Sequence, residues 1–86
     1  MSNLTPTIED VRSCLSAVLP ELPEDSRVNL FSTKAIDSLR LIETVVHLEK
    51  SYAVQFDSNL LSVETFETLE KIHATVVELL ARKGGQ

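Results

Sequence analysis

Several residue types that build functional sites are scarce in this chain of 86 residues. It has one cysteine, Cys14, so neither an intramolecular disulfide nor a cysteine-rich zinc site can form. Its two glycines, Gly84 and Gly85, stand together near the C-terminus, which excludes a glycine-rich phosphate loop. The 8 basic residues are outnumbered by 13 acidic ones, and the resulting net charge of −5 argues against nucleic-acid binding, which needs clustered Lys and Arg.

Long hydrophobic runs and aromatic residues are also few. No stretch approaches the ~18 apolar residues of a membrane span, and residues 1–10 lack the basic and apolar regions of a secretory signal peptide. We therefore expect a cytoplasmic, monomeric protein without a membrane span. The length allows a single domain over residues 1–86, with no room for a deep catalytic cavity. With no Trp, one Tyr and three Phe, the core must consist mainly of Leu, Val and Ile.

Helical periodicity dominates what is present, and it predicts an all-α fold. Long helices are expected over residues 6–19, 38–52 and 68–82, with Thr5 and Thr68 as N-caps of the first and last. Pro6 would be the first helical residue. The prediction is a small four-helix bundle of three long helices and one short one, the short helix lying within residues 51–67, and residues 83–86 forming a tail.

A long connecting loop is predicted over residues 20–36, which contain two prolines and show no sustained period. The loop residues that could anchor it to the core are Val28, Leu30, Phe31 and Ile36. The helical stripes expected to face the core are Ile8, Val11, Leu15, Val18 and Leu19; then Leu41, Ile42, Val45, Leu48 and Tyr52; then Leu60, Leu61, Val63 and Phe66; and finally Leu69, Ile72, Val76, Leu79 and Leu80. In the second helix, Leu39 and Val46 lie at the edge of the stripe, Thr44 lies on the polar side, and Glu49 interrupts the stripe.

The start of the second helix holds the main candidate for chemistry, Ser38. Either Asp37 or Ser38 could cap the helix. A nucleophilic serine needs a base, but His47 lies nine residues further on, about 13 Å along a helix. His73 lies on the last helix, and both histidines are expected at the surface without metal-ligand spacing. With no nucleophile elbow either, the chain is not expected to be an enzyme.

The start of a helix, where Ser38 lies, favours an anionic substituent on electrostatic grounds. Exposed N–H groups and the positive end of the helix dipole stabilise a phosphate at a helix N-terminus. The segments around it, "LFSTKAIDSLRLIETVVHLEKSYAVQF" (residues 30–56) and "NLLSVETFETLEKI" (residues 59–72), resemble the acyl and peptidyl carrier proteins. The resemblance extends over about residues 5–82 and includes the attachment motif Asp37-Ser38-Leu39.

The resemblance implies that Ser38 carries covalent 4′-phosphopantetheine from coenzyme A, with Asp37 and Leu39 completing the motif. It also implies that partner enzymes contact the second helix, through the side chains of Leu39, Arg40, Glu43, Val46 and Glu49. These partners would be a phosphopantetheinyl transferase, an acyl- or aminoacyl-activating ligase or synthetase, and a downstream acyltransferase or synthase. The chain would then be a freestanding carrier that holds its cargo as a thioester and shuttles it between biosynthetic enzymes.

Two departures from the family pattern bear on this interpretation. Family members usually have a glycine shortly before the Asp-Ser pair, whereas this chain has Lys34 and Ala35, so the loop must turn differently or accept strain. Arg40 and Lys50 make the second helix less acidic than in fatty-acid carriers, which argues against a carrier of that type. The segment "LFSTKAIDSL" (residues 30–39) more closely resembles discrete carriers that serve amino-acid activation or specialised biosynthesis, including D-alanyl carriers. The alternative is a non-catalytic helical protein-interaction module without a prosthetic group, in which Ser38 is only a cap.

Overall fold

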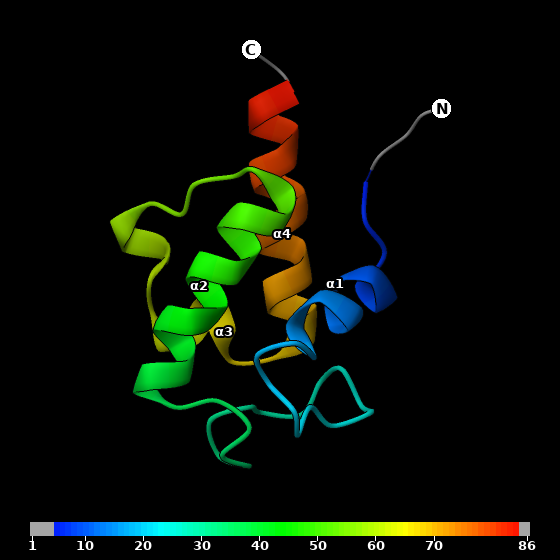
Figure 1. Cartoon of the computed structure of the whole chain (residues 1–86), viewed down its shortest axis with the longest axis vertical. Helices are drawn as coiled ribbons and strands as arrows, with labels where there is room; N and C mark the ends of the chain where they lie inside the picture. Colours follow the sequence, from blue (N-terminus) through cyan, green and yellow to red (C-terminus); the bar gives the residue numbers. More distant parts are fainter. Residues whose placement is uncertain (1–4, 85–86) are drawn as a thin grey trace.

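Four α-helices and one 3₁₀ turn form the framework of the computed structural model, which describes residues 5–84 (Figure 1). The helices are α1 (Ile8–Leu15), α2 (Ser38–Tyr52), the short α3 (Val63–Phe66) and α4 (Leu69–Gly84), and the 3₁₀ turn η1 spans Ser58–Leu60. No strand occurs within residues 5–84. The predicted all-α fold is confirmed, as is the long loop between α1 and α2. Helix α4 contacts each of the other three helices.

The boundaries of α2 and the cap of α4 lie where the sequence predicts them, but α1 is shorter than predicted. Its N-cap is Thr7 rather than Thr5, because Thr7 Oγ1 accepts a hydrogen bond from the Asp10 N–H (3.1 Å) and Asp10 Oδ2 accepts one from the Thr7 N–H (2.9 Å). This reciprocal pair is a capping box, and it satisfies the N–H groups of Thr7 and Asp10 at the start of the helix. The chain leaves the helix after Leu15, and only looser turns follow.

Helix α4 is longer than predicted. The Thr68 hydroxyl accepts a hydrogen bond from the Lys71 N–H (3.1 Å), as expected for the N-cap. At the other end the helix includes Lys83 and Gly84, so these two residues do not belong to a tail. The Lys83 ammonium donates to the Ala53 carbonyl (2.7 Å), which ties the last turn of α4 to the end of α2. The rest of the predicted tail, residues 85–86, lies outside the described residues, as do residues 1–4.

The core draws on all four helices and on both long connections. Helix α1 contributes Val11 and Leu15, and Phe66 of α3 packs its ring 5.6 Å from that of Phe56, centroid to centroid. The single cysteine, Cys14, is half-buried against this core. The other buried apolar residues are Leu19, Leu30, Ala35, Ile36, Leu48, Val54, Leu69, Ile72, Val76 and Leu79. Leu30 and Ile36 therefore anchor the long loop as predicted.

Four residues lie on the opposite side from that predicted. Helix α2 directs Thr44 and Leu48 at the core, so that Thr44 is fully buried and Ile42, on another side of the helix, is 63% exposed. The short α3 buries only one side, which Phe66 occupies. Val63, in the same helix, is consequently 56% exposed, and Leu61, at the end of η1, is 46% exposed instead of pointing inward.

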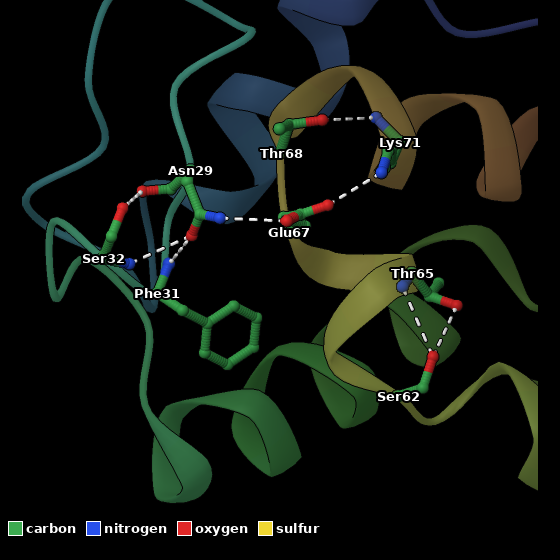
Figure 2. A network of polar contacts seen from close by, with 8 residues as sticks. All are labelled: Asn29, Phe31, Ser32, Ser62, Thr65, Glu67, Thr68 and Lys71. Atoms are coloured by element: carbon green, nitrogen blue, oxygen red, sulfur yellow. Dashed lines mark hydrogen bonds and ion pairs between the residues drawn. The ribbon is translucent and has the colours of Figure 1, made fainter.

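Glu67, between α3 and α4, anchors the middle of the long loop (Figure 2). Its carbonyl accepts a hydrogen bond from the Leu30 N–H (2.7 Å). Its carboxylate accepts one from the Asn29 side-chain amide (3.0 Å) and another from the Lys71 ammonium (2.7 Å). The bond to Glu67 raises the pKa of Lys71. One residue therefore holds the loop against the first turn of α4.

Two further contacts secure the first half of the loop. The Arg12 guanidinium, on α1, donates to the carbonyls of Pro23 (2.6 Å) and Glu24 (2.8 Å). The Glu70 N–H, on α4, donates to the Ser26 carbonyl (3.1 Å). The loop is thus held between α1 and α4. It lies at the same end of the molecule as the first turn of α2 (Figure 1).

Replacing Thr44 by valine should stabilise the protein. The Thr44 hydroxyl is buried without a hydrogen-bond partner among the described residues. Removing it while keeping the side-chain shape should raise the free energy of unfolding by about 1 kcal/mol. Urea denaturation measures this, with Thr75→Val as the matched control because the Thr75 hydroxyl donates to the Lys71 carbonyl (2.9 Å) on α4. Equal effects of the two substitutions would show that the Thr44 hydroxyl is satisfied in solution.

Candidate functional site

The site is built around the first turn of α2, which Asp37 caps. Asp37 has an extended backbone, its Oδ1 accepts a hydrogen bond from the Arg40 N–H (2.9 Å), and its carbonyl accepts one from the Leu41 N–H (2.7 Å). The sequence alone allowed either Asp37 or Ser38 to cap the helix. The structure gives the role to Asp37 and makes Ser38 the first residue of the helix.

The Ser38 hydroxyl has no structural task in the described part of the chain. Ser38 is exposed, and its side chain makes no hydrogen bond with any of residues 5–84. The backbone N–H groups of Ser38 and Leu39 also make none within that range, as is usual for the first turn of a helix. A hydroxyl and two N–H groups are therefore available together at the positive end of a 15-residue helix.

A hollow lies directly beside Ser38. Its walls come from the long loop, the start of α2 and the start of α3, and its lining residues are Phe31, Lys34, Ile36, Asp37, Ser38 and Val63. Phe31, Ile36 and Val63 make part of it apolar, and Lys34 and Asp37 contribute one charge of each sign. Together with the N–H groups of the first turn of α2, this lining is compatible with a substituent on Ser38 that has an anionic end and a less polar remainder.

Lys34 has a backbone φ of 65°, in the left-handed region that favours glycine. The loop thus makes the turn that a glycine would make, and accepts strain at a lysine. The sequence predicted that the loop either turns differently or accepts strain, and the structure shows a left-handed residue that is strained. The strain lies four residues before Ser38.

An exposed apolar stripe runs along the outer face of α2 from the residue next to Ser38. It consists of Leu39 (66% exposed), Ile42 (63%) and Val46 (44%). The exposure of Leu39 and Val46 agrees with their predicted place at the edge of the core-facing side. Ile42 was missed, although its spacing from Leu39 and Val46 already indicated a second stripe on one helix face.

Of the three charged residues predicted to contact partners, two also bond within the protein. Arg40 Nη1 donates to the Val18 carbonyl (2.5 Å), which ties α2 to the turn after α1. Glu49 is half-buried, and its Oε2 accepts a hydrogen bond from the Phe56 N–H (2.9 Å). This bond explains why an acid interrupts the apolar stripe of α2. Glu43 is exposed.

The histidines do not assist Ser38. His73 is half-buried rather than at the surface, and its Nε2 lies 2.9 Å from the Pro6 carbonyl oxygen. His47 is half-buried beside the exposed stripe of α2. Within residues 5–84, no group of three His, Cys, Asp or Glu side chains is placed to hold a metal ion. None of the helices described there has the length and apolar character needed to cross a membrane.

No family model, curated protein or solved structure matches this chain. Its function must therefore be inferred from the residues around Ser38 and along α2.

Separate substitutions of Asp37 and Ser38 should have different effects on stability. Asp37→Ala removes the cap and should lower the free energy of unfolding by about 1 kcal/mol. Ser38→Ala removes an exposed hydroxyl that has no hydrogen-bond partner among the described residues, and it should change the free energy of unfolding by less than about 0.5 kcal/mol. Urea denaturation of the two variants beside the wild type measures both values. A larger loss for Ser38→Ala than for Asp37→Ala would contradict the assignment of the cap.

Lys34→Gly should relieve the strain before α2. Left-handed backbone is costly for a residue with a Cβ, and the relief should outweigh the added freedom of glycine in the unfolded chain by about 1 kcal/mol. The neighbouring Ala35→Gly is the matched control, because Ala35 is buried and has no positive φ, so this change should destabilise the protein. Thermal or urea unfolding compares the two. Destabilisation by both would mean that Lys34 is unstrained in solution.

Proposed function

We propose that this protein is an acyl or aminoacyl carrier whose Ser38 hydroxyl is the attachment point of 4′-phosphopantetheine. The observation that carries the proposal is the exposed Ser38 hydroxyl at the start of α2, which makes no hydrogen bond with any of residues 5–84 and lies next to a separate cap residue. A serine that capped the helix through its oxygen would lose part of that role on modification. Here the cap is Asp37, so a substituent on Ser38 leaves the helix start intact.

The residues around Ser38 suit the phosphate end of this group. The N–H groups of Ser38 and Leu39 and the helix dipole stabilise an anion at that point. Lys34 lines the same hollow, where its ammonium offsets the Asp37 carboxylate. The apolar walls formed by Phe31 and Val63 suit the less polar part of the arm. When bound, the group supplies a terminal thiol that holds the acyl or aminoacyl cargo as a thioester.

The attachment step requires an external enzyme. The Ser38 oxygen forms a bond to the phosphorus of coenzyme A that bears the pantetheine, the pyrophosphate bond breaks, and adenosine 3′,5′-bisphosphate leaves. The hydroxyl proton must pass to a base of the phosphopantetheinyl transferase, because no base among residues 5–84 is hydrogen-bonded to Ser38. The chain is thus a substrate of catalysis rather than a catalyst.

The exposed stripe on α2 is where the enzymes that act on the arm would dock. Leu39, Ile42 and Val46 form an apolar patch that begins beside Ser38, and exposed apolar patches of this kind mark interaction sites. A transferase, an activating ligase or synthetase and a downstream acyltransferase or synthase would share it in turn. A surface shared by several partners is expected to form small, transient interfaces.

The same stripe supports a second candidate function, a helical interaction module without a prosthetic group. Such a module would bind its partner through the apolar face of α2, and this binding would not require the Ser38 hydroxyl. The two candidates therefore differ in whether Ser38 can be modified.

Intact-mass measurement after incubation with coenzyme A and a broad-specificity phosphopantetheinyl transferase separates them. The wild type should gain the mass of one phosphopantetheine, and Ser38→Ala should gain none. Ser58→Ala is the matched control, because Ser58 is also an exposed serine at the first position of a helical turn, η1. This variant should be modified like the wild type.

Two outcomes would contradict the carrier proposal. One is the absence of any gain with a transferase that modifies a control carrier, which would favour the interaction module. The other is a gain that persists in Ser38→Ala, which would place the attachment elsewhere.

A further inference from the structure

The exposed stripe of α2 forms one side of a shallow groove, and the turn after α1 forms the other. Its lining residues are Ala17, Val18, Leu39, Arg40, Ile42, Glu43, Val46, His47 and Lys50. Five of these nine are apolar, and the bond from Arg40 to the Val18 carbonyl holds the two sides together. The groove is therefore an apolar surface on a fixed framework, with charged side chains along it.

The charge of this groove has the opposite sign to that of the whole protein. Arg40 and Lys50 outnumber the single carboxylate of Glu43, which gives the groove a net charge of +1 with His47 neutral. The protein as a whole carries −5, so the residues outside the groove carry −6. The first turn of α2 contains no acidic residue. The lining of the groove therefore carries one net positive charge on an otherwise acidic molecule.

The spacing of the stripe suits a helical partner. Leu39, Ile42 and Val46 follow one another at intervals of three and four residues, so they lie on one face of α2 over about 10 Å, or two helical turns. Side chains at this spacing form a ridge on α2, and such a ridge can pack into the groove between side chains of a second helix.

We propose that the groove binds an amphipathic helix of a partner protein, and that acidic side chains flank the apolar face of this helix. The apolar residues of the partner contact Leu39, Ile42 and Val46, and its carboxylates face Arg40 and Lys50. Electrostatic complementarity of this kind selects partners and speeds their encounter. The inference deepens the proposed function, and rests on it in so far as the partner is an enzyme that acts on the Ser38 arm.

Titration with two peptides tests this inference. Both are amphipathic helices with the same apolar face, one flanked by glutamates and the other by lysines. The glutamate peptide should shift the amide NMR signals of residues 39–50 and of Ala17 and Val18, and should bind more tightly than the lysine peptide. The overall charge of −5 would favour the lysine peptide, so the comparison separates the local charge of the groove from the charge of the whole protein.

Charge variants make the test specific to the groove. Lys50→Glu should weaken binding of the glutamate peptide about threefold or more, since a favourable exposed pair becomes a repulsive one. Glu43→Lys should strengthen it. Arg27→Glu is the matched control, because Arg27 is exposed in the long loop outside the groove and the change in net charge equals that of Lys50→Glu. This control should leave the affinity within about twofold of the wild-type value.

Four results would overturn the inference: equal or tighter binding of the lysine peptide, shifts confined to other elements, no binding of either peptide, or equal weakening by Lys50→Glu and Arg27→Glu. A fifth is self-association that Lys50→Glu abolishes, which would assign the groove to a second copy. That copy could offer the exposed Leu61 and Val63 beside Glu64. None of these results depends on modification of Ser38, so a failure here is distinguishable from a failure of the carrier proposal.

Discussion

The place where α2 begins depends on how the long loop is held to the core. The Leu30 N–H donates to the carbonyl of Glu67, and the Ile36 N–H donates to the carbonyl of Leu30 (3.1 Å). Leu30 and Ile36 are both buried, so the segment between them doubles back over a fixed base. Asp37 follows at once as the cap of α2. The position of Ser38 therefore follows from contacts with the start of α4, which is far away in the sequence.

At the start of α2, neighbouring residues divide the tasks of folding and chemistry. Asp37 satisfies the helix end, which leaves the Ser38 oxygen without a structural role. At position 34 local backbone preference would select glycine, because glycine adopts a φ of 65° at lower cost than lysine does. Lysine brings a cation to the hollow beside Ser38, where the proposed substituent carries its negative charge. Strain of this kind is often retained near functional sites.

Local signals in the sequence were enough for the limits of α2, the cap at Thr68 and the long loop, because periodicity and capping act over a few residues. The first cap was mistaken because Thr5 followed by Pro6 was given priority, although the spacing of Thr7 and Asp10, which form the reciprocal bonds, is itself a local capping signal. The direction in which α2 faces, which buries Thr44 and exposes Ile42, depends on packing against distant elements. Bonds to distant backbone groups, such as that from Arg40 to Val18, leave no periodic signal either.

The central claim is that Ser38 can be modified without loss to the fold, because Asp37 alone caps α2. Urea unfolding of the protein before and after attachment of 4′-phosphopantetheine to Ser38 tests this most directly. The account predicts a free energy of unfolding that is unchanged within about 0.5 kcal/mol or slightly raised, since the helix N-terminus favours an anion. A loss of about 1 kcal/mol or more on attachment would show that the Ser38 hydroxyl serves the helix start, and would contradict the claim.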